Sequence, residues 1–405
     1  MNLFRLSLAN LRNQALSTVL TLLLLTLGVG TIVVLWLLGM QLKSQMERDL
    51  RGIDLVVGAK GSPLQLILSS IYHIDIPTGN IPIAQAELIA KNPLVAATIP
   101  LALGDSIQGA RIVGTTPDYL RHYGAELASG VLWSAPLEAV LGAEVAARTQ
   151  FKLGDTFIGN HGLEGAGMGH EKHPYRVVGL LKPSGTVIDR LVLTSVDSVH
   201  KVHEGMATMN PAAPALAGAP TTSPDQEITA LLVKYRTPLA AVTLPRMVNA
   251  QSALQAASPA MEAGRLTSLF GVGIKVLQGF AYVLIAVAAL SIFVALYSAL
   301  QKRQFDLAMM RVLGASRLKV MWSILLEGLW LGIAGALLGI AFGHLAAQGV
   351  ALWLGRTQHV FFSGAAWSPM ELWLLLLALV GVVAALIPAI QAYRLDIVRV
   401  LAESR

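Results

Sequence analysis

The chain has 405 residues, of which 54% are hydrophobic and only 13% are charged, and its formal net charge is +6. Soluble domains carry about 25% charged residues, so this composition indicates a membrane protein with a sizeable polar part. The absence of cysteine excludes disulfides, thiolate metal sites and cysteine nucleophiles.

The first apolar segment, residues 17–40, carries no charge. A helix needs about 20 residues to cross a hydrocarbon core of about 30 Å, so this segment is long enough to span a membrane. The alternative is a cleaved signal peptide, whose apolar core is only about 7–15 residues long and precedes a small-residue cleavage site. Segment 17–40 is too long for such a core, so we predict a retained membrane anchor with a cytoplasmic N-terminus. Leu42, Met46 and Leu50 repeat every four residues, which predicts that the helix continues to Arg51.

Residues 41–275 form a long polar insertion in which strand-like runs alternate with helical patterns. The runs are rich in Val, Ile and Leu and are bounded by Gly, Pro or Asp, which predicts an α+β domain. The predicted strands are 53–57, 110–114, 139–141, 175–181, 190–194 and 228–235, and the predicted helices are 83–91, 117–123 and 239–256. Segment 205–226 is Pro-rich and almost uncharged, which predicts a mobile loop.

Three more apolar segments, 276–300, 320–351 and 372–392, close the chain. Basic residues cluster in 1–16, 301–320 and 393–405, whereas the loop 352–371 has only Arg356. The positive-inside rule then predicts four spans, both termini in the cytoplasm and the large domain outside. The predicted fold is an α-helical membrane protein with four transmembrane helices and an α+β periplasmic domain inserted between helices 1 and 2. The corresponding segments are 1–40, 41–275 and 276–405.

Residues 301–320, QKRQFDLAMMRVLGASRLKV, set five basic residues against one acid, Asp306. Phe305, Met309 and Val312 follow helical spacing, so they share one face of a short amphipathic helix predicted at 301–316. Gly314 is placed to end that helix, and Ser316 to cap the next one. The alternative is an ordinary basic loop that obeys the positive-inside rule.

This arrangement resembles the permease subunits of type VII ABC transporters, the FtsX-like or MacB-like permeases of macrolide-exporting, lipoprotein-releasing and cell-division systems. The segment RQFDLAMMRVLGASRLKV is similar to the signature between the second and third spans, and PAIQAYRLDIVRVLAESR to the C-terminal signature. Four segments resemble the periplasmic core domain of the family in order: GARIVGTTPDYLRHYGAELASGVLW, EAVLGAEVAARTQFKLGDTFIG, YRVVGLLKPSGTVIDRLVLTSVDSV and ITALLVKY. The resemblance covers nearly the whole chain.

The resemblance implies that two permeases pair, as a homodimer, and that each binds a separate cytoplasmic ATPase. It also implies a bacterial inner-membrane location and a helix between spans two and three that couples to the ATPase. The coupling residues would be Phe305, Asp306, Met309, Arg311 and Gly314. The chain has no G-x-x-x-x-G-K-[ST] loop, so we expect ATP to act only through the partner and the chain itself to have no enzyme activity. Further expected partners are membrane lipids and a periplasmic binding or membrane-fusion protein, and no nucleic acid.

The third span contains an acid and a strip of glycines. A carboxylate at Glu327 is costly in a membrane unless it faces a partner or water, so we interpret it as structural or gating, with a proton relay as the alternative. Gly335, Gly339 and Gly343 recur every four residues, and such a strip lets two helices approach closely. The facing helix is either the first span of a partner permease or a helix of the same chain.

Four potential zinc ligands lie close together in a Gly-rich segment: His161, His170, Glu171 and His173. Imidazole and carboxylate are good zinc ligands, so metal contact is one interpretation and a solvated loop is the other. No H-E-x-x-H frame is present, which argues against a hydrolase.

The resemblance therefore implies a permease that couples ATP hydrolysis by its partner to movement of the periplasmic domain, acting on an envelope or periplasmic ligand, and the histidines make zinc one candidate. Three alternatives remain: a cell-division-type permease that regulates an envelope enzyme, export of lipoprotein, lipid or drug, and a membrane-anchored metalloenzyme.

Overall fold

The computed structural model describes residues 15–161, 173–203, 227–251, 253–357 and 378–394, together with a few single positions near the two ends. The chain divides into two compact units. The helical unit consists of Met1–Leu42 and Leu269–Arg405, and the domain unit consists of Lys43–Ser268. The predicted loop 205–226 lies outside the described residues.

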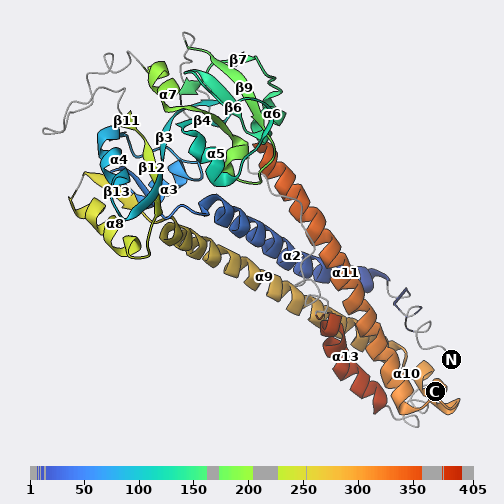
Figure 1. Ribbon diagram of the computed structural model, residues 1–405. Coiled ribbons are helices and arrows are strands. Elements are labelled where there is room, and N and C mark those ends of the chain that lie inside the picture. The colour runs from blue at the N-terminus through green and yellow to red at the C-terminus, as the bar shows by residue number, and fades with distance from the viewer. Residues whose placement is uncertain are drawn as a thin grey trace. The chain divides into compact units, whose positions relative to one another are not determined.

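The domain unit is built on one mixed sheet, whose main path has the strand order β13-β1-β12-β3-β4-β10-β6-β9-β5 (Figure 1). Off this path, β7 pairs with β9 and β8 pairs with β3. The strands are β1 Leu55–Ala59, β3 Val95–Ile107, β4 Ala110–Thr115, β5 Leu127–Gly130, β6 Glu138–Leu141, β7 Thr156–Phe157, β8 Asn160–His161, β9 Tyr175–Leu181, β10 Leu191–Ser195, β12 Ala230–Tyr235 and β13 Leu254–Ala257. A separate small pair joins β2 Ile81–Pro82 to β11 Glu227–Ile228.

Strand β3 joins the two halves of this sheet. Its first part pairs with β12 and its second part pairs with β4, both antiparallel. The register of the β3–β4 pair shifts between Leu103 and Ser106, as in a β-bulge. Because a bulge bends a strand and increases its twist, one strand can belong to two differently oriented halves.

Helices cover the sheet and close its apolar core. They are α3 Pro63–Ser70, α4 Ile83–Ala90, α5 Pro117–Tyr123, α6 Ala143–Thr149, α7 Val196–His203 and α8 Ala240–Gln251, with a 3₁₀ turn η1 at Val187–Arg190. Local sequence explains several boundaries. Ser62 accepts a hydrogen bond from the backbone N–H of Gln65 at the start of α3, and Gly124 ends α5 in the left-handed region at φ 64°.

Most predicted elements of the domain are confirmed. All six predicted strand segments contain strands, and helices 83–91 and 117–123 match α4 and α5. The predicted helix 239–256 is wrong at its end, since α8 stops at Gln251 and Leu254–Ala257 is strand β13. There, Val56 and Val57 of β1 pair with Ala257 and Ala256, so sheet pairing overrides the local helical pattern.

The helical unit contains α2 Ala15–Leu50, α9 Pro259–Lys302, α10 Gln304–Val312, α11 Arg317–Thr357 and α13 Ala378–Tyr393, where α2 and α9 also extend into the domain unit. Among the described residues, α2, α9 and α11 are long and apolar enough to cross a membrane, and α13 is a shorter apolar helix. The predicted continuation of the first helix beyond residue 40 is confirmed as far as Leu50, one residue before the predicted end at Arg51. The second apolar segment begins earlier than its hydropathy indicated, since α9 is already helical at Pro259.

Candidate functional site

Helix α10 lies at the turn that joins α9 to α11, and local sequence explains where α10 ends and where α11 begins (Figure 1). Gly314 has φ 99°, which favours glycine, and follows the last turn of the helix. The N–H of Gly314 bonds to the carbonyl of Arg311, and the N–H of Ala315 to that of Met310, the pattern of a Schellman motif. Ser316 then accepts a hydrogen bond from the N–H of Lys319 at 3.3 Å, which caps α11.

Helix α10 has one exposed apolar face and one buried face. Phe305, Met309 and Val312 are 48%, 39% and 57% exposed. Leu307 and Ala308 are buried, and Leu307 packs in a core cluster with side chains of α9, α11 and α13. The helix is therefore held by its inner face and presents the predicted apolar face outward.

Charged groups flank this face. Asp306 is exposed in the first turn of α10, where the helix dipole favours an acid, and Arg311 lies in the last turn, where it favours a base. At the break between α9 and α10, the guanidinium of Arg303 lies 3.8 Å from the carboxylate of Glu327, whose side chain is 6% exposed. Sequence reasoning chose Glu327 but missed Arg303. An acid inside an apolar helix requires a counter-charge. The basic residues at the nearest break between two helices could therefore have identified Arg303 as the partner.

The glycine strip of α11 faces the first helix of the same chain. A Cβ built on Gly335 would meet Leu25, one on Gly339 would meet Val29, and one on Gly343 would meet Val33. Val29 and Val33 are almost completely buried in this contact. Because the glycines of α11 have no side chains, the backbone of α11 contacts the side chains of α2 directly.

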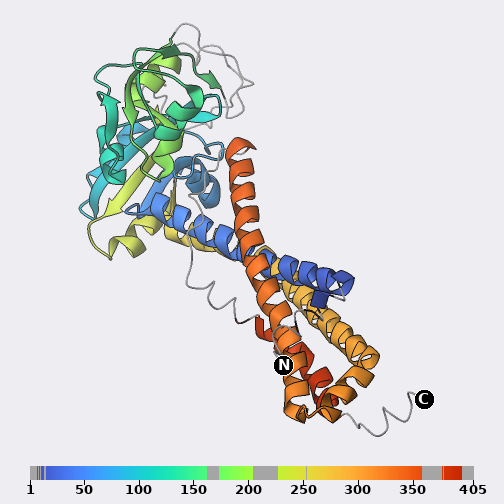
Figure 2. The same ribbon diagram turned by 90° about the vertical axis from the view of Figure 1, so that its right-hand side faces the viewer.

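A second small-residue contact, which sequence reasoning missed, joins α11 to α13, and the two helices run side by side (Figure 2). Cβ atoms built on Gly328 and Gly332 would meet the backbone of Gly381 and Ala378. Gly328 and Gly332 precede Gly335 with similar spacing, so a longer search along the third apolar segment would have found them.

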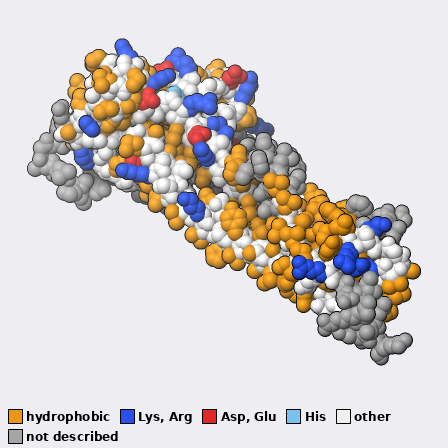
Figure 3. Space-filling view, turned by 90° about the horizontal axis from the view of Figure 1, so that it is seen from below, with side chains coloured by type: hydrophobic (Ala, Val, Ile, Leu, Met, Phe, Trp, Pro, Cys, Tyr) orange, Lys and Arg blue, Asp and Glu red, His pale blue; other side chains and the backbone are white. Residues whose placement is uncertain are grey.

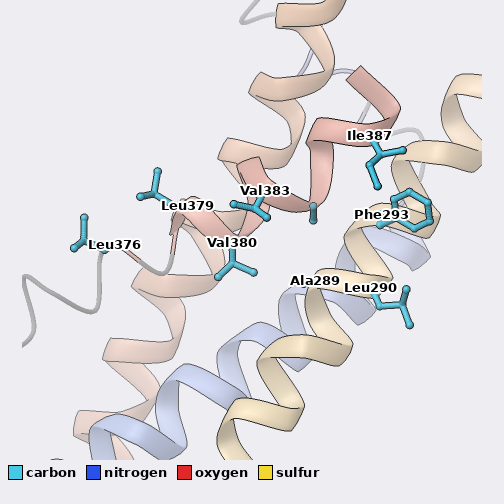
Figure 4. Close-up of a pocket in the computed structure, with 9 residues that line it drawn as sticks. Ala289, Leu290, Phe293, Leu376, Leu379, Val380, Val383 and Ile387 are labelled. Carbon is cyan, nitrogen blue, oxygen red and sulfur yellow. The ribbon is translucent and has the colours of Figure 1, made fainter. Parts of the chain in front are cut away.

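An apolar groove lies between α9 and α13 (Figure 4). Its cavity volume is about 450 Å³. Leu290 and Phe293 come from α9, and Val380, Val383 and Ile387 come from α13. None of the described residues that line it is charged, so this lining is suited to hydrocarbon contact.

The end of α2 is tied into the domain unit through Asp49, whose side chain is 1% exposed. Its carboxylate accepts hydrogen bonds from the backbone N–H of Val187 at 2.8 Å and from the Gln45 amide at 3.1 Å, and it lies 3.6 Å from the Arg190 guanidinium. The backbone carbonyl of Asp49 also accepts a hydrogen bond from the hydroxyl of Tyr123 at 2.7 Å. A buried carboxylate with this many donors is strongly held, because each partner replaces water lost on burial.

The loop that receives α2 is itself organised by a second carboxylate. Asp189 of η1 accepts hydrogen bonds from the backbone N–H groups of Ser184 and Gly185 at 2.9 and 2.7 Å. The carbonyl of Gly185 then accepts a hydrogen bond from Arg48 of α2 at 3.1 Å. No local pattern predicts this contact between α2 and the loop, since Asp49 and Val187 are 138 positions apart.

The predicted zinc ligands lie mostly outside the described residues. His170 and Glu171 belong to segment 162–172, and only the backbone of His161 is described, at the end of β8. His173 is described and half-buried. Within the described part of the chain, no three His, Cys, Asp or Glu side chains form a group that could hold a metal.

Comparisons with known proteins match both units of the chain. The family model of the MacB-like periplasmic core domain matches residues 18–258, and that of the FtsX-like permease C-terminal region matches residues 279–397. No curated protein matches.

Two solved structures are similar to part of the chain. The crystal structure of the periplasmic region of MacB from Actinobacillus actinomycetemcomitans is 15% identical, with a TM-score of 0.33, and the match covers 54% of this chain and 95% of that one. The crystal structure of the extracellular domain of the noncanonic ABC-type transporter YknZ from Gram-positive bacteria is 11% identical, with a TM-score of 0.30, and the match covers 50% of this chain and 98% of that one.

The two family models together cover nearly all of both units, in the order that the apolar helices and the mixed domain follow along the chain. The chain therefore belongs to the MacB/FtsX-like permeases and is the permease subunit of a type VII ABC transporter.

Proposed function

We propose that this permease converts ATP-driven movement of a cytoplasmic ATPase into movement of its periplasmic domain. The observation that carries the proposal is the continuity of two helices. Helices α2 and α9 have 36 and 44 residues, and each contributes to both units without a break. At about 1.5 Å per residue they are about 54 and 66 Å long, which exceeds a hydrocarbon core of about 30 Å. A displacement at one end of such a helix is passed to the other end.

The joints at the domain end support this transmission. Helix α2 is fixed through Asp49, as described above. On α9, the buried carboxylate of Glu262 pairs with Arg265 at 2.9 Å, and Leu266 packs against the main core cluster of the domain together with Met46 and Leu50 of α2. Both helices therefore pack against the core of the domain, so a movement of either helix displaces the domain.

Helix α10 is the proposed docking element for the ATPase. Its apolar face is exposed, whereas its opposite face is buried against the other helices, so a load on α10 reaches α9 and α11 directly. Asp306 and Arg311 would set the register of docking, and the Arg303–Glu327 ion pair would hold the α9–α10 break against α11.

Co-purification of the permease with its ATPase tests this docking. Met309→Arg places a charge in the exposed apolar face and should abolish co-purification and permease-dependent ATPase activity. Gln301→Arg is the matched control, because it adds the same charge at an exposed position before α10. Equal complex formation by both variants would remove α10 from the interface.

We further propose the four-span topology predicted from the sequence, with segment 372–392 as the last span, both termini in the cytoplasm and a homodimeric assembly. The natural absence of cysteine makes labelling direct. Ser316→Cys should react with a membrane-impermeant maleimide only after the inner membrane is opened, and Ser134→Cys should react in intact spheroplasts. The reverse pattern would invert the topology.

Zinc contact through His161, His170, Glu171 and His173 is a separate proposal, supported by the ligand types and their proximity in sequence. Titration calorimetry of the whole protein with zinc tests it against a variant with the three histidines changed to Ala. Binding that the variant loses would support metal sensing or traffic, and equal behaviour of the two proteins would end the proposal.

A further inference from the structure

A second groove of the helical unit, between the first turn of α2 and the last third of α9, differs in character from the apolar groove beside α13. Its cavity volume is about 660 Å³. The wall from α2 is Ala15, Leu16 and Ser17, and Leu16 is 78% exposed. The wall from α9 consists of Val287, Leu290, Ser291, Val294, Ala295, Ser298 and Lys302. We call it the α2–α9 groove.

The α9 wall of this groove is mostly apolar in its first part and polar at its end. Val287, Leu290 and Val294 are exposed, at 45%, 60% and 52%, and Ser291 lies among them. Ser298 follows these residues, and Lys302 stands at the end of the helix. The stripe from Val287 to Lys302 is about 22 Å long, which matches one leaflet of a bilayer, about 20–22 Å with its head groups.

Hydrocarbon, then hydroxyl, then ammonium is the order that complements an acyl chain, a glycerol ester and a phosphate. We propose that the α2–α9 groove binds an anionic phospholipid of the cytoplasmic leaflet, with its phosphate on Lys302 and its ester region beside Ser298. The proposal depends on the cytoplasmic placement of the α9–α10 break, and it goes beyond the coupling function.

Charge distinguishes this occupant from a second copy of the chain. Within the described residues, Lys302 forms no ion pair. The only carboxylates among the described residues of the helical unit are Asp306 on α10 and Glu327, which is buried beside Arg303. The described part of a second helical unit therefore offers only Asp306 as an exposed carboxylate, whereas an anionic head group supplies the opposite charge directly at Lys302.

The surroundings strengthen the attraction. Lys and Arg side chains gather toward one end of the helical unit, beyond a largely hydrophobic surface (Figure 3). Arg12, Arg317 and Lys319 are exposed basic residues of the helical unit. A basic residue near a cytoplasmic leaflet attracts anionic lipid with an energy of about 1 kcal/mol, and a pocket between helices adds a fixed position to that attraction.

Native mass spectrometry of the whole protein, released from detergent, tests the proposal. The probes are palmitoyl-oleoyl phosphatidylglycerol and the phosphatidylcholine with the same acyl chains. We expect the phosphatidylglycerol adduct to be favoured, and Lys302→Gln to lower its affinity about fivefold while leaving the phosphatidylcholine adduct unchanged. Lys319→Gln is the matched control, because it removes an exposed basic charge outside the groove.

A second variant tests the hydrocarbon part without changing charge. Val294→Trp fills the groove and should lower binding of both lipids, whereas Val283→Trp, at a similarly exposed position of α9 outside the groove, should not. Equal adducts with both lipids, or equal effects of the two lysine changes, would overturn the proposal. A shift in the monomer–dimer ratio with Val294→Trp, without loss of lipid, would assign the groove to a second copy instead. Co-purification with the ATPase is independent of all these outcomes, so failure here leaves the coupling function standing.

Discussion

Glu144 is a half-buried carboxyl group near Asp49, the residue that ties the end of α2 into the domain unit. It lies in the first turn of α6, which packs against η1 so closely that a Cβ on Gly142 would meet the carbonyl oxygen of Ile188. Burial raises the pKa of Glu144 from 4.5 to about 7, although the Arg190 guanidinium opposes the shift. A carboxyl group in this range titrates near neutral pH and gives the domain a pH-dependent stability.

The sign of that dependence follows from proton linkage. Between pH 4.5 and about 7 the folded state holds a proton that the unfolded state has released, so the free energy of unfolding falls as pH rises through this window. We expect Glu144→Gln, which keeps the shape and cannot ionise, to become progressively more stable than the natural protein from pH 5 to pH 7. Thermal unfolding of the detergent-solubilised protein at pH 5, 6, 7 and 8 measures this difference. The exposed Glu87→Gln change is the control, and a difference that does not grow with pH would contradict the prediction.

A single substitution can break the contact between α2 and α11. A Cβ on Gly339 would lie 2.6 Å from Cβ of Val29, whereas a Cβ on Gly349 of the same helix meets nothing within 4 Å. Gly339→Leu should therefore separate the two helices and lower stability by about 1–3 kcal/mol, as overpacking of a close contact does. Gly349→Leu is the matched control and should have little effect on the thermal midpoint in detergent. Similar midpoints for the two variants would show that the contact is loose.

The α9–α10 break and α11 are joined by the Arg303–Glu327 ion pair. Removal of Arg303 leaves a buried carboxylate without this counter-charge, and breaking a buried pair costs about 3–5 kcal/mol. We expect Arg303→Met to be strongly destabilising, and the double variant Arg303→Met with Glu327→Met to recover much of the loss, because both charges are then gone. A double-mutant cycle on thermal stability measures the coupling. Strictly additive effects would mean that the two groups do not interact across the break.

Local rules predicted the elements that local residues determine. Gly314 and Ser316 were predicted from sequence as helix end and helix cap, because each acts on backbone groups within a few positions. The strand β3 was not predicted, since Pro100 and Gly104 interrupt its pattern and its pairing with β12 and β4 stabilises it from elsewhere. The predicted end of helix 239–256 was wrong for the same reason, because Leu254–Ala257 forms strand β13 by pairing with β1.

In the candidate site, too, features that depend on neighbouring residues were predictable and features that depend on distant residues were not. The amphipathic pattern of 301–316 was enough to predict the exposed face of α10. The joints that connect the helices to the rest of the chain depend on residues far apart in sequence, such as Asp49 with Val187 and Gly339 with Val29. A single sequence carries no period or spacing that links such pairs, so they became visible only in the folded chain.

Transmission through α2 and α9 leads to a prediction for the assembled transporter. If these helices carry movement between the units, flexible insertions at the unit boundaries should uncouple the domain without releasing the ATPase. We therefore expect Gly-Gly-Ser-Gly inserted after Leu42 in α2, or after Ser268 in α9, to reduce the ATP-dependent change in hydrogen–deuterium exchange of the domain strands. Glycine breaks helical continuity because it costs about 1 kcal/mol per residue in a helix interior and frees the backbone.

The double insertion should abolish the exchange response of the domain, since both continuous paths are then interrupted, while the response of α10 to the ATPase persists. The same insertion between Gln108 and Gly109, in the turn that joins β3 to β4, is the control, because it leaves both helices intact. Measurement in the permease–ATPase complex, with and without ATP, separates loss of transmission from loss of binding. A domain response that survives the double insertion would show that movement reaches the domain by a route other than these two helices.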